Sequence, residues 1–161
     1  MFVNFNDLPG HSRVWVYQAD RILSEDEELQ ISVLAKQFVE RWTAHNQDLQ
    51  ASFQIRYNLF LILAADETQA SASGCSIDKS VAFIKELQQK FNVNFLNRMI
   101  FAYKEHDEVY PLKREEFAEK IKTGYIDNNT IVFNNLVLNK SDLNTSWEIP
   151  YAESWHKHIL N

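Results

Sequence analysis

The sequence predicts an α/β domain in which one four-stranded, mixed sheet is packed against helices. Segments with the composition of strands alternate with segments whose apolar residues recur at helical spacing, in the order β-α-β-α-β-α-β-α. The chain has 161 residues, 45% of them hydrophobic and 13% aromatic, so it can bury a core and is too apolar to be disordered. No linker or internal repeat divides it, and we expect one domain spanning residues 1–161.

The first part of the chain predicts a strand followed by a helix. Residues 13–18 are rich in β-branched and aromatic side chains, which is typical of a strand. Ser24 and Glu27 have the spacing of a capping box, which begins a helix. The helix is expected to end near His45. Its apolar residues form one stripe, which should face the sheet: Ile31, Leu34, Ala35, Phe38 and Trp42.

One long strand is predicted from Phe53 to Ala65. Apolar and polar residues alternate as far as Leu59 and the pattern is then continuously apolar, so the strand should be half-buried at first and buried on both faces later. Asn58 is where a bend or bulge would fit. A second helical stripe follows, and it should pack on this strand: Ile77, Val81, Ile84, Leu87 and Phe91.

The second half of the chain continues the alternation. Residues 99–103 predict a third strand, and residues 113–122 a helix that Gly124 ends. Residues 130–133 predict a fourth strand, interrupted at Asn134-Asn135 by amides that are expected to form hydrogen bonds. A loop or short helix is then expected over residues 141–147, and a terminal helix over residues 151–160.

The loop before the second predicted helix contains the residues with the clearest chemical potential. It holds the only cysteine, Cys75, and one of three glycines, Gly74, and the strand before it ends in Asp66 and Glu67. Ligand sites of α/β proteins often lie where a strand leads through a loop into a helix. Gly74 would allow a tight turn there, and Ser73 or Ser76 would cap the helix. Capping alone accounts for these residues, so a plain helix start is one interpretation.

Two functional interpretations of the same loop remain open. In the first, free N–H groups at residues 74–77, with Lys79 nearby, hold a phosphate or carboxylate, and Asp78 competes for these groups. In the second, Cys75 is a nucleophile, because a helix N-terminus favours the thiolate. Its base would be a histidine distant in sequence, His45 or His106. We predict two catalytic residues and four ligand-binding residues: Cys75 and Asp66, and Gly74, Ser76, Asp78 and Lys79.

Neither a metal site nor a cofactor is predicted. His156 and His158 are two residues apart, which on a helix directs them to different sides, and the other histidines lack the spacing of metal ligands. Asp66 and Glu67 are carboxylates of the kind that bind metals or transfer protons, but a solvated turn explains the pair as well.

Charge and composition restrict the partners of the protein. The net charge is −6 and Lys and Arg form no long block, which disfavours nucleic acid. The longest apolar run, residues 59–65, is too short to span a bilayer, so no membrane partner is expected. A lone cysteine and an N-terminus without the pattern of a signal peptide predict a cytoplasmic protein. The oligomeric state does not follow from the sequence.

Several segments resemble a family of short bacterial proteins, some of which are labelled "ABC transporter ATPase". The resemblance spans nearly the whole chain, but it implies no reaction that can be transferred. It is carried by residues 12–18 (SRVWVYQ), residues 73–78 (SGCSID), residues 133–135 (FNN), and the later Trp147 and Pro150. A P-loop requires G-x-x-x-x-G-K-[ST], and the three glycines lie too far apart to form one. The sequence therefore contradicts the ATPase label, while a nucleotide site without a P-loop stays open.

These observations predict a small-ligand or protein-binding domain whose site lies at residues 66–79, with a small anion or a protein as its partner. The alternative is a hydrolase or transferase that uses Cys75 or a pair of carboxylates. A third interpretation is an adaptor that binds through the aromatic residues of the C-terminal part, Trp147, Tyr151 and Trp155.

Overall fold

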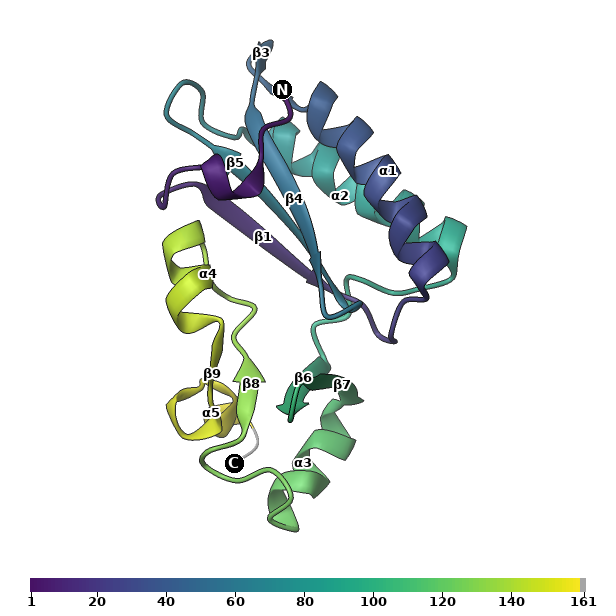
Figure 1. Ribbon diagram of the computed structural model, residues 1–161, viewed down its shortest axis with the longest axis vertical. Helices are drawn as coiled ribbons and strands as arrows, with labels where there is room; N and C mark the ends of the chain where they lie inside the picture. Colours follow the sequence, from purple (N-terminus) through teal and green to yellow (C-terminus); the bar gives the residue numbers. More distant parts are fainter. Residues whose placement is uncertain (160–161) are drawn as a thin grey trace.

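The computed structural model describes residues 1–159 and contains three sheets with helices around them (Figure 1). The first sheet has three strands in the order β1-β5-β4, which are β1 (Arg13–Gln18), β4 (Gln50–Arg56) and β5 (Phe60–Asp66). Both ladders are antiparallel. The central strand β5 is buried along almost its whole length, because one face lies under helices and the other under the C-terminal part of the chain.

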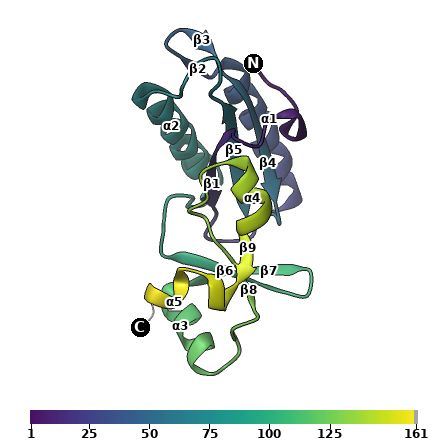
Figure 2. The same ribbon diagram turned by 90° about the vertical axis from the view of Figure 1, so that its left-hand side faces the viewer.

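Two long helices cover one face of the first sheet. They are α1 (Glu25–Arg41) and α2 (Gly74–Phe91), and in Figure 2 they lie behind the sheet. Trp15 of β1 packs against Trp42, which follows α1, with ring centroids 5.2 Å apart. The predicted capping box at Ser24 and Glu27 is present at the start of α1.

The opposite face of the first sheet is covered by two short helices from opposite ends of the chain. They are the 3₁₀-helix η1 (Phe5–Asp7) and α4 (Lys140–Ser146), which lies in front of the sheet in Figure 2. The Lys140 ammonium donates hydrogen bonds to the carbonyl oxygens of Asn6 and Leu8, at 2.8 and 2.5 Å. This lysine is buried, and its hydrogen bonds join the two terminal parts of the chain over the sheet.

The second large sheet has four antiparallel strands in the order β7-β6-β8-β9. These strands are β6 (Ile100–Glu105), β7 (Glu108–Lys113), β8 (Ile131–Phe133) and β9 (Glu148–Pro150). Helix α3 (Arg114–Lys122), the 3₁₀-helix η2 (Tyr151–Glu153) and helix α5 (His156–Ile159) accompany it. Between them lies a second, smaller core: Phe101, Tyr103, Phe117, Ile126 and Val132.

The mixed α/β composition is confirmed, but the single four-stranded sheet is not, because the strands form sheets of three, two and four strands. The two-stranded sheet is a short hairpin of β2 (Thr43–Ala44) and β3 (Gln47–Asp48) that the sequence did not predict. Strands β7 and β9 were also missed. Both contain a proline, Pro111 and Pro150, and both lie at the edges of their sheet, where a missing N–H is tolerated.

The long strand predicted from Phe53 to Ala65 is in fact the hairpin of β4 and β5. The chain reverses at Tyr57 and Asn58, which have positive φ angles of 57° and 50°, and the N–H of Leu59 donates to the carbonyl of Arg56 at 3.1 Å. Two successive residues with positive φ make a type I′ turn, whose usual sequences contain Asn or Gly. Tyrosine is unusual at the first position, and this concealed the turn.

The tip of this hairpin docks onto the second sheet. Tyr57 and Phe60 pack against Phe133 and Trp147 with ring centroids 4.9 to 6.1 Å apart. Nearby, the Asn135 amide nitrogen donates to Gln18 Oε1 at 2.8 Å.

Further hydrogen bonds join the sheets around Asn134 and Asn135. Gln18 Nε2 donates to the Phe101 carbonyl of β6 at 3.1 Å. The indole N–H groups of Trp147 and Trp155 donate to the side-chain oxygens of Asn135 and Asn134, at 2.9 and 3.0 Å. The expected hydrogen-bonding role of the two asparagine amides is therefore confirmed.

Burial of the two helical stripes follows the prediction only in part. Ile31, Ile84 and Leu87 are fully buried. Leu34, Phe38 and Phe91 are half-buried and lie at the margin of the core. The terminal helix predicted over residues 151–160 is instead the 3₁₀-helix η2 followed by the short α5, and Leu160 lies outside the described residues.

Replacement of Phe60 by alanine should cost roughly 3–5 kcal/mol of unfolding free energy, because a fully buried ring between the two sheets is lost and a cavity remains. Urea denaturation measures this cost. The matched control is Leu138→Ala, at a position where the side chain is 67% exposed. A Phe60→Ala loss no larger than the control's would contradict the role assigned to this contact.

Acid should destabilise the protein through His156, which is buried beside Trp155 and hydrogen-bonded to Ser154. Burial lowers the pKa of His156 to about 4, from 6.5. The folded state therefore takes up this proton at lower pH than the unfolded chain, and stability declines as the pH falls from 6.5 towards 4. Unfolding free energies should drop by roughly 2 kcal/mol from about pH 7.5 to about pH 5. His156→Phe should remove most of this drop, whereas the exposed His158→Phe should retain it.

Candidate functional site

The predicted site begins where α2 starts, and a capping box forms its first turn. Ser73 Oγ accepts the N–H of Ser76 at 3.1 Å, and Ser76 Oγ accepts the N–H of Ser73 at 3.3 Å. Gly74 is the first residue of the helix, and its backbone does not have a positive φ. Its expected role in a tight turn is therefore not observed.

The first turn of α2 is fixed to the segment that follows α1. The Ser76 hydroxyl is buried and donates to the Thr43 carbonyl at 2.8 Å, and the indole N–H of Trp42 donates to the Ser76 carbonyl at 2.9 Å. The β2–β3 hairpin continues from Thr43, and His45 and Asn46 form its tip with φ angles of 51° and 62°. Ser76 thus supports the fold, while its predicted contact with a ligand remains a prediction.

Two backbone N–H groups at the start of α2 are free. No hydrogen bond from the N–H of Gly74 or Cys75 reaches any of residues 1–159, and both residues are exposed. This is expected of the first residues of a helix, since they have no acceptor one turn earlier. Asp78 lies beyond the first turn, which contains no acidic residue, so its expected competition for these groups is weaker than the sequence suggested. The exposed Lys79 follows it.

Asp66, the last residue of β5, has partners of its own. Its carboxylate accepts the N–H of Thr68 at 2.9 Å and the Thr68 hydroxyl at 2.5 Å, and lies 3.3 Å from His11 Nε2. The hydrogen bonds from Thr68 hold the pKa of Asp66 below its usual value. Within residues 1–159, no hydrogen bond or ion pair joins Asp66 to residues 74–79. The predicted site residues therefore form two groups.

Glu67 stabilises the loop that joins these two groups. Its carboxylate accepts the N–H of Ala72 at 3.2 Å and lies 3.8 Å from the guanidinium of Arg13. The same guanidinium lies over the ring of Trp15, 4.8 Å from its centroid. This carboxylate thus orders the approach to α2.

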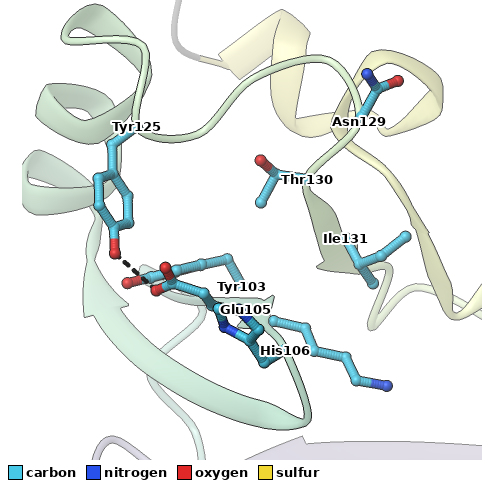
Figure 3. A pocket seen from close by; sticks show the side chains of 8 residues that line it. Tyr103, Glu105, His106, Tyr125, Asn129, Thr130 and Ile131 are labelled. Atoms are coloured by element: carbon cyan, nitrogen blue, oxygen red, sulfur yellow. Dashed lines mark hydrogen bonds between the residues drawn. The ribbon is translucent and has the colours of Figure 1, made fainter.

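A cavity of about 480 Å³ lies in the second sheet and is not lined by any residue of the predicted site. Figure 3 shows Tyr125 and Glu105 on one side of it, with Asn129, Thr130 and Ile131 across from them. The Tyr125 hydroxyl donates to Glu105 at 2.6 Å, and this hydrogen bond raises the pKa of Tyr125 to about 12. The Lys120 ammonium lies 3.9 Å from the centre of the Tyr125 ring. The face of this ring therefore already has a cation–π partner from the chain itself.

One polar cluster was missed by the sequence analysis. The Tyr57 hydroxyl donates to the Glu148 carboxylate at 2.8 Å, and the Lys104 ammonium donates to Glu148 at 3.0 Å and to the Tyr57 oxygen at 3.3 Å. Glu148 raises the pKa of Lys104, and burial raises that of Tyr57. The three residues lie far apart in sequence, on β6, on β9 and in a turn, so no spacing could have revealed them. They link the two large sheets.

The described part of the chain gives no sign of a metal centre or of a membrane span. Across residues 1–159, no three His, Cys, Asp or Glu side chains are grouped so that they could hold a metal ion. The helices of the same range are all too short or too polar to cross a bilayer. Comparisons with protein-family models, with curated proteins and with solved structures found no match to the chain.

Substitutions at Ser76 and Cys75 should differ in their effect on stability, because the Ser76 side chain supports the fold and the Cys75 side chain is exposed. Ser76→Ala should cost roughly 1–3 kcal/mol, because it leaves the partly buried Thr43 carbonyl and the Ser73 N–H without their partner. Cys75→Ser should change stability by no more than about 0.5 kcal/mol, because the thiol is exposed. Denaturation midpoints test both. A large loss for Cys75→Ser would show that the thiol packs in the core and would contradict its place at the surface.

Proposed function

We propose that this protein is a binding domain, and that it receives an anionic group of a small ligand or of a protein partner at the start of α2. The observation that carries the proposal is the pair of exposed, unpartnered N–H groups of Gly74 and Cys75, in a first turn without an acidic residue. Such groups and the helix dipole favour a phosphate or carboxylate at this position. Lys79 would add a positive charge, and Ser76 and Asp78 would border the ligand.

The magnitude of this attraction restricts the kind of ligand. A charge at an exposed helix N-terminus gains about 0.3–1 kcal/mol, which does not bind a free ion tightly. The anionic group therefore belongs to a larger molecule that makes further contacts. We also propose that the protein is cytoplasmic, since phosphorylated metabolites and proteins are abundant there. The proposal includes no P-loop ATPase activity.

An enzyme that uses Cys75, a hydrolase or a transferase, is the alternative. It is favoured by the exposure of the thiol and by the attachment of the β2–β3 hairpin to the first turn of α2, because this hairpin carries His45. In that mechanism Cys75 would attack and His45 would accept its proton. Asp66 lies in the other group of residues and is not bonded to either of them.

The experiment uses the only cysteine of the chain as a probe of its own surroundings. Iodoacetate carries a negative charge and iodoacetamide does not, so the ratio of their alkylation rates reports the attraction of an anion to Cys75. In the folded protein this ratio should be about two- to fivefold higher than in a peptide of residues 70–80.

Gly74→Pro and Gly74→Ala form the matched pair of variants. Proline at the first helical residue removes one free N–H, and Ser73 has the extended backbone that precedes proline readily, with ψ of 169°. Alanine keeps the N–H, and a Cβ at this position meets no other atom within 4 Å. The rate ratio should fall in the proline variant and persist in the alanine variant. Equal ratios in both would exclude the free N–H groups as the anion site.

A further inference from the structure

We propose that the open edge of β4, from Phe53 to Arg56, binds an extended, acidic peptide segment of a partner protein by strand addition, and that the Arg56 guanidinium receives a carboxylate of that segment. This surface is separate from the start of α2 and does not depend on the function proposed for it. Four features of the described residues support the inference.

The first feature is that strand pairing along this edge stops short. The Ala51 N–H donates to the Met1 carbonyl at 3.0 Å, and the Val3 N–H donates to the Ala51 carbonyl at 3.0 Å, after which the chain turns away into η1. Outward-facing backbone groups alternate along an antiparallel strand, so those of Phe53 and Ile55 face the same side as those of Ala51. No segment among residues 1–159 pairs with β4 there.

The second feature is a cavity of about 390 Å³ between η1 and this edge. It is lined by two segments of the chain: Phe2 and Asn4 to Asp7 on one side, and Ser52 to Gln54 on the other. Ser52 is buried, with 1% of its surface exposed, and its hydroxyl has no hydrogen-bond partner within the described residues. The cavity leaves room beside the edge of β4 for a side chain of a partner.

The third feature is the state of Arg56, which adjoins this cavity. Its Nε donates to Gln54 Oε1 at 2.8 Å, and its guanidinium carbon lies 5.8 Å from the ring centre of Phe5 and 5.5 Å from that of Trp147. Burial lowers the pKa of Arg56. Across residues 1–159, its two terminal nitrogens form no hydrogen bond or ion pair. The Glu148 carboxylate is hydrogen-bonded by Tyr57 and Lys104, and its charge acts on Arg56 only from beyond ion-pair distance. A guanidinium stacked in this way presents a fork that fits a carboxylate.

The fourth feature is that the strand itself carries no acid. The residues of β4 are QASFQIR, so a second copy paired edge to edge through β4 would not bring a carboxylate from that strand to Arg56. Each copy also carries a net charge of −6, which opposes self-association. An acidic strand from another protein would supply both the backbone hydrogen bonds and a carboxylate in hydrogen-bond contact with the terminal nitrogens of Arg56. Its acidic side chain would point to the same face as those of Ser52, Gln54 and Arg56, because alternate residues share a face.

The test is a selection of random twelve-residue peptides displayed on phage against the full chain. Enriched peptides should share an acidic residue flanked by β-branched residues, and their synthetic forms should protect the amide hydrogens of Phe53 and Ile55 from exchange. Arg56→Gln should weaken their binding at least tenfold, while the matched control Arg41→Gln, at an exposed position, should leave it unchanged. In the wild type, replacing the acidic residue of the peptide by Gln should weaken binding by the same factor. In Arg56→Gln the same replacement should leave the affinity of the peptide unchanged.

The remaining outcomes overturn the proposal. Peptides that bind equally well without an acid would exclude the carboxylate, and peptides that leave Phe53 and Ile55 exchanging freely would exclude strand addition. Failure to enrich any peptide would exclude a peptide-binding edge. A concentration-dependent dimer in sedimentation, with protection of the same two amides, would assign the edge to a second copy. Thermal unfolding of both arginine variants establishes that the comparison is made between folded proteins.

Discussion

The contact between the β4–β5 hairpin and the second sheet is the interaction on which this structure depends. Tyr57 and Phe60 lie against Phe133 and Trp147, and the Tyr57 hydroxyl is held by Glu148 and Lys104. Tyr57 adopts a positive φ, which costs energy for a residue other than glycine. Aromatic packing and charged hydrogen bonds offset this cost, so the turn and the junction of the two sheets stabilise each other.

This junction also determines which surfaces remain available for binding. One face of the first sheet lies under α1 and α2, and the other lies under η1, α4 and the residues that lead to Trp147. What stays open is the periphery of the sheet: the start of α2 with its free N–H groups, and the edge of β4 beside Arg56. The first surface offers free N–H groups and the second a guanidinium, on a protein whose net charge is −6. The anionic groups that we propose for these places would therefore be attracted by local geometry and not by the overall field.

The sequence predicted best where structure is local. The predicted capping box begins α1, a serine caps α2 as expected, and the amides of Asn134 and Asn135 are hydrogen-bonded as expected. The strict alternation of single strands and helices is not confirmed, because hairpins stand where single strands were predicted. The sequence predicted least where distant segments meet. Residues 66–79 contain the exposed helix start, but nothing in their spacing indicated that Asp66 would bind Thr68 and lie beside His11. The hairpin turn at Tyr57 was missed because a tyrosine does not signal positive φ.

The sequence by itself determined where α1 and α2 begin, which segments are apolar and which chemical groups each loop offers, because capping and periodicity act within a few residues. Tertiary structure alone decided the rest. It divided the strands into three antiparallel sheets, since a continuous apolar run is compatible both with one long strand and with a hairpin. It placed Lys104 and Glu148 at Tyr57, and it placed Arg56 between Phe5 and Trp147, where its terminal nitrogens form no hydrogen bond within the described residues. These arrangements arise from long-range packing, which brings together side chains whose separation in sequence carries no signal.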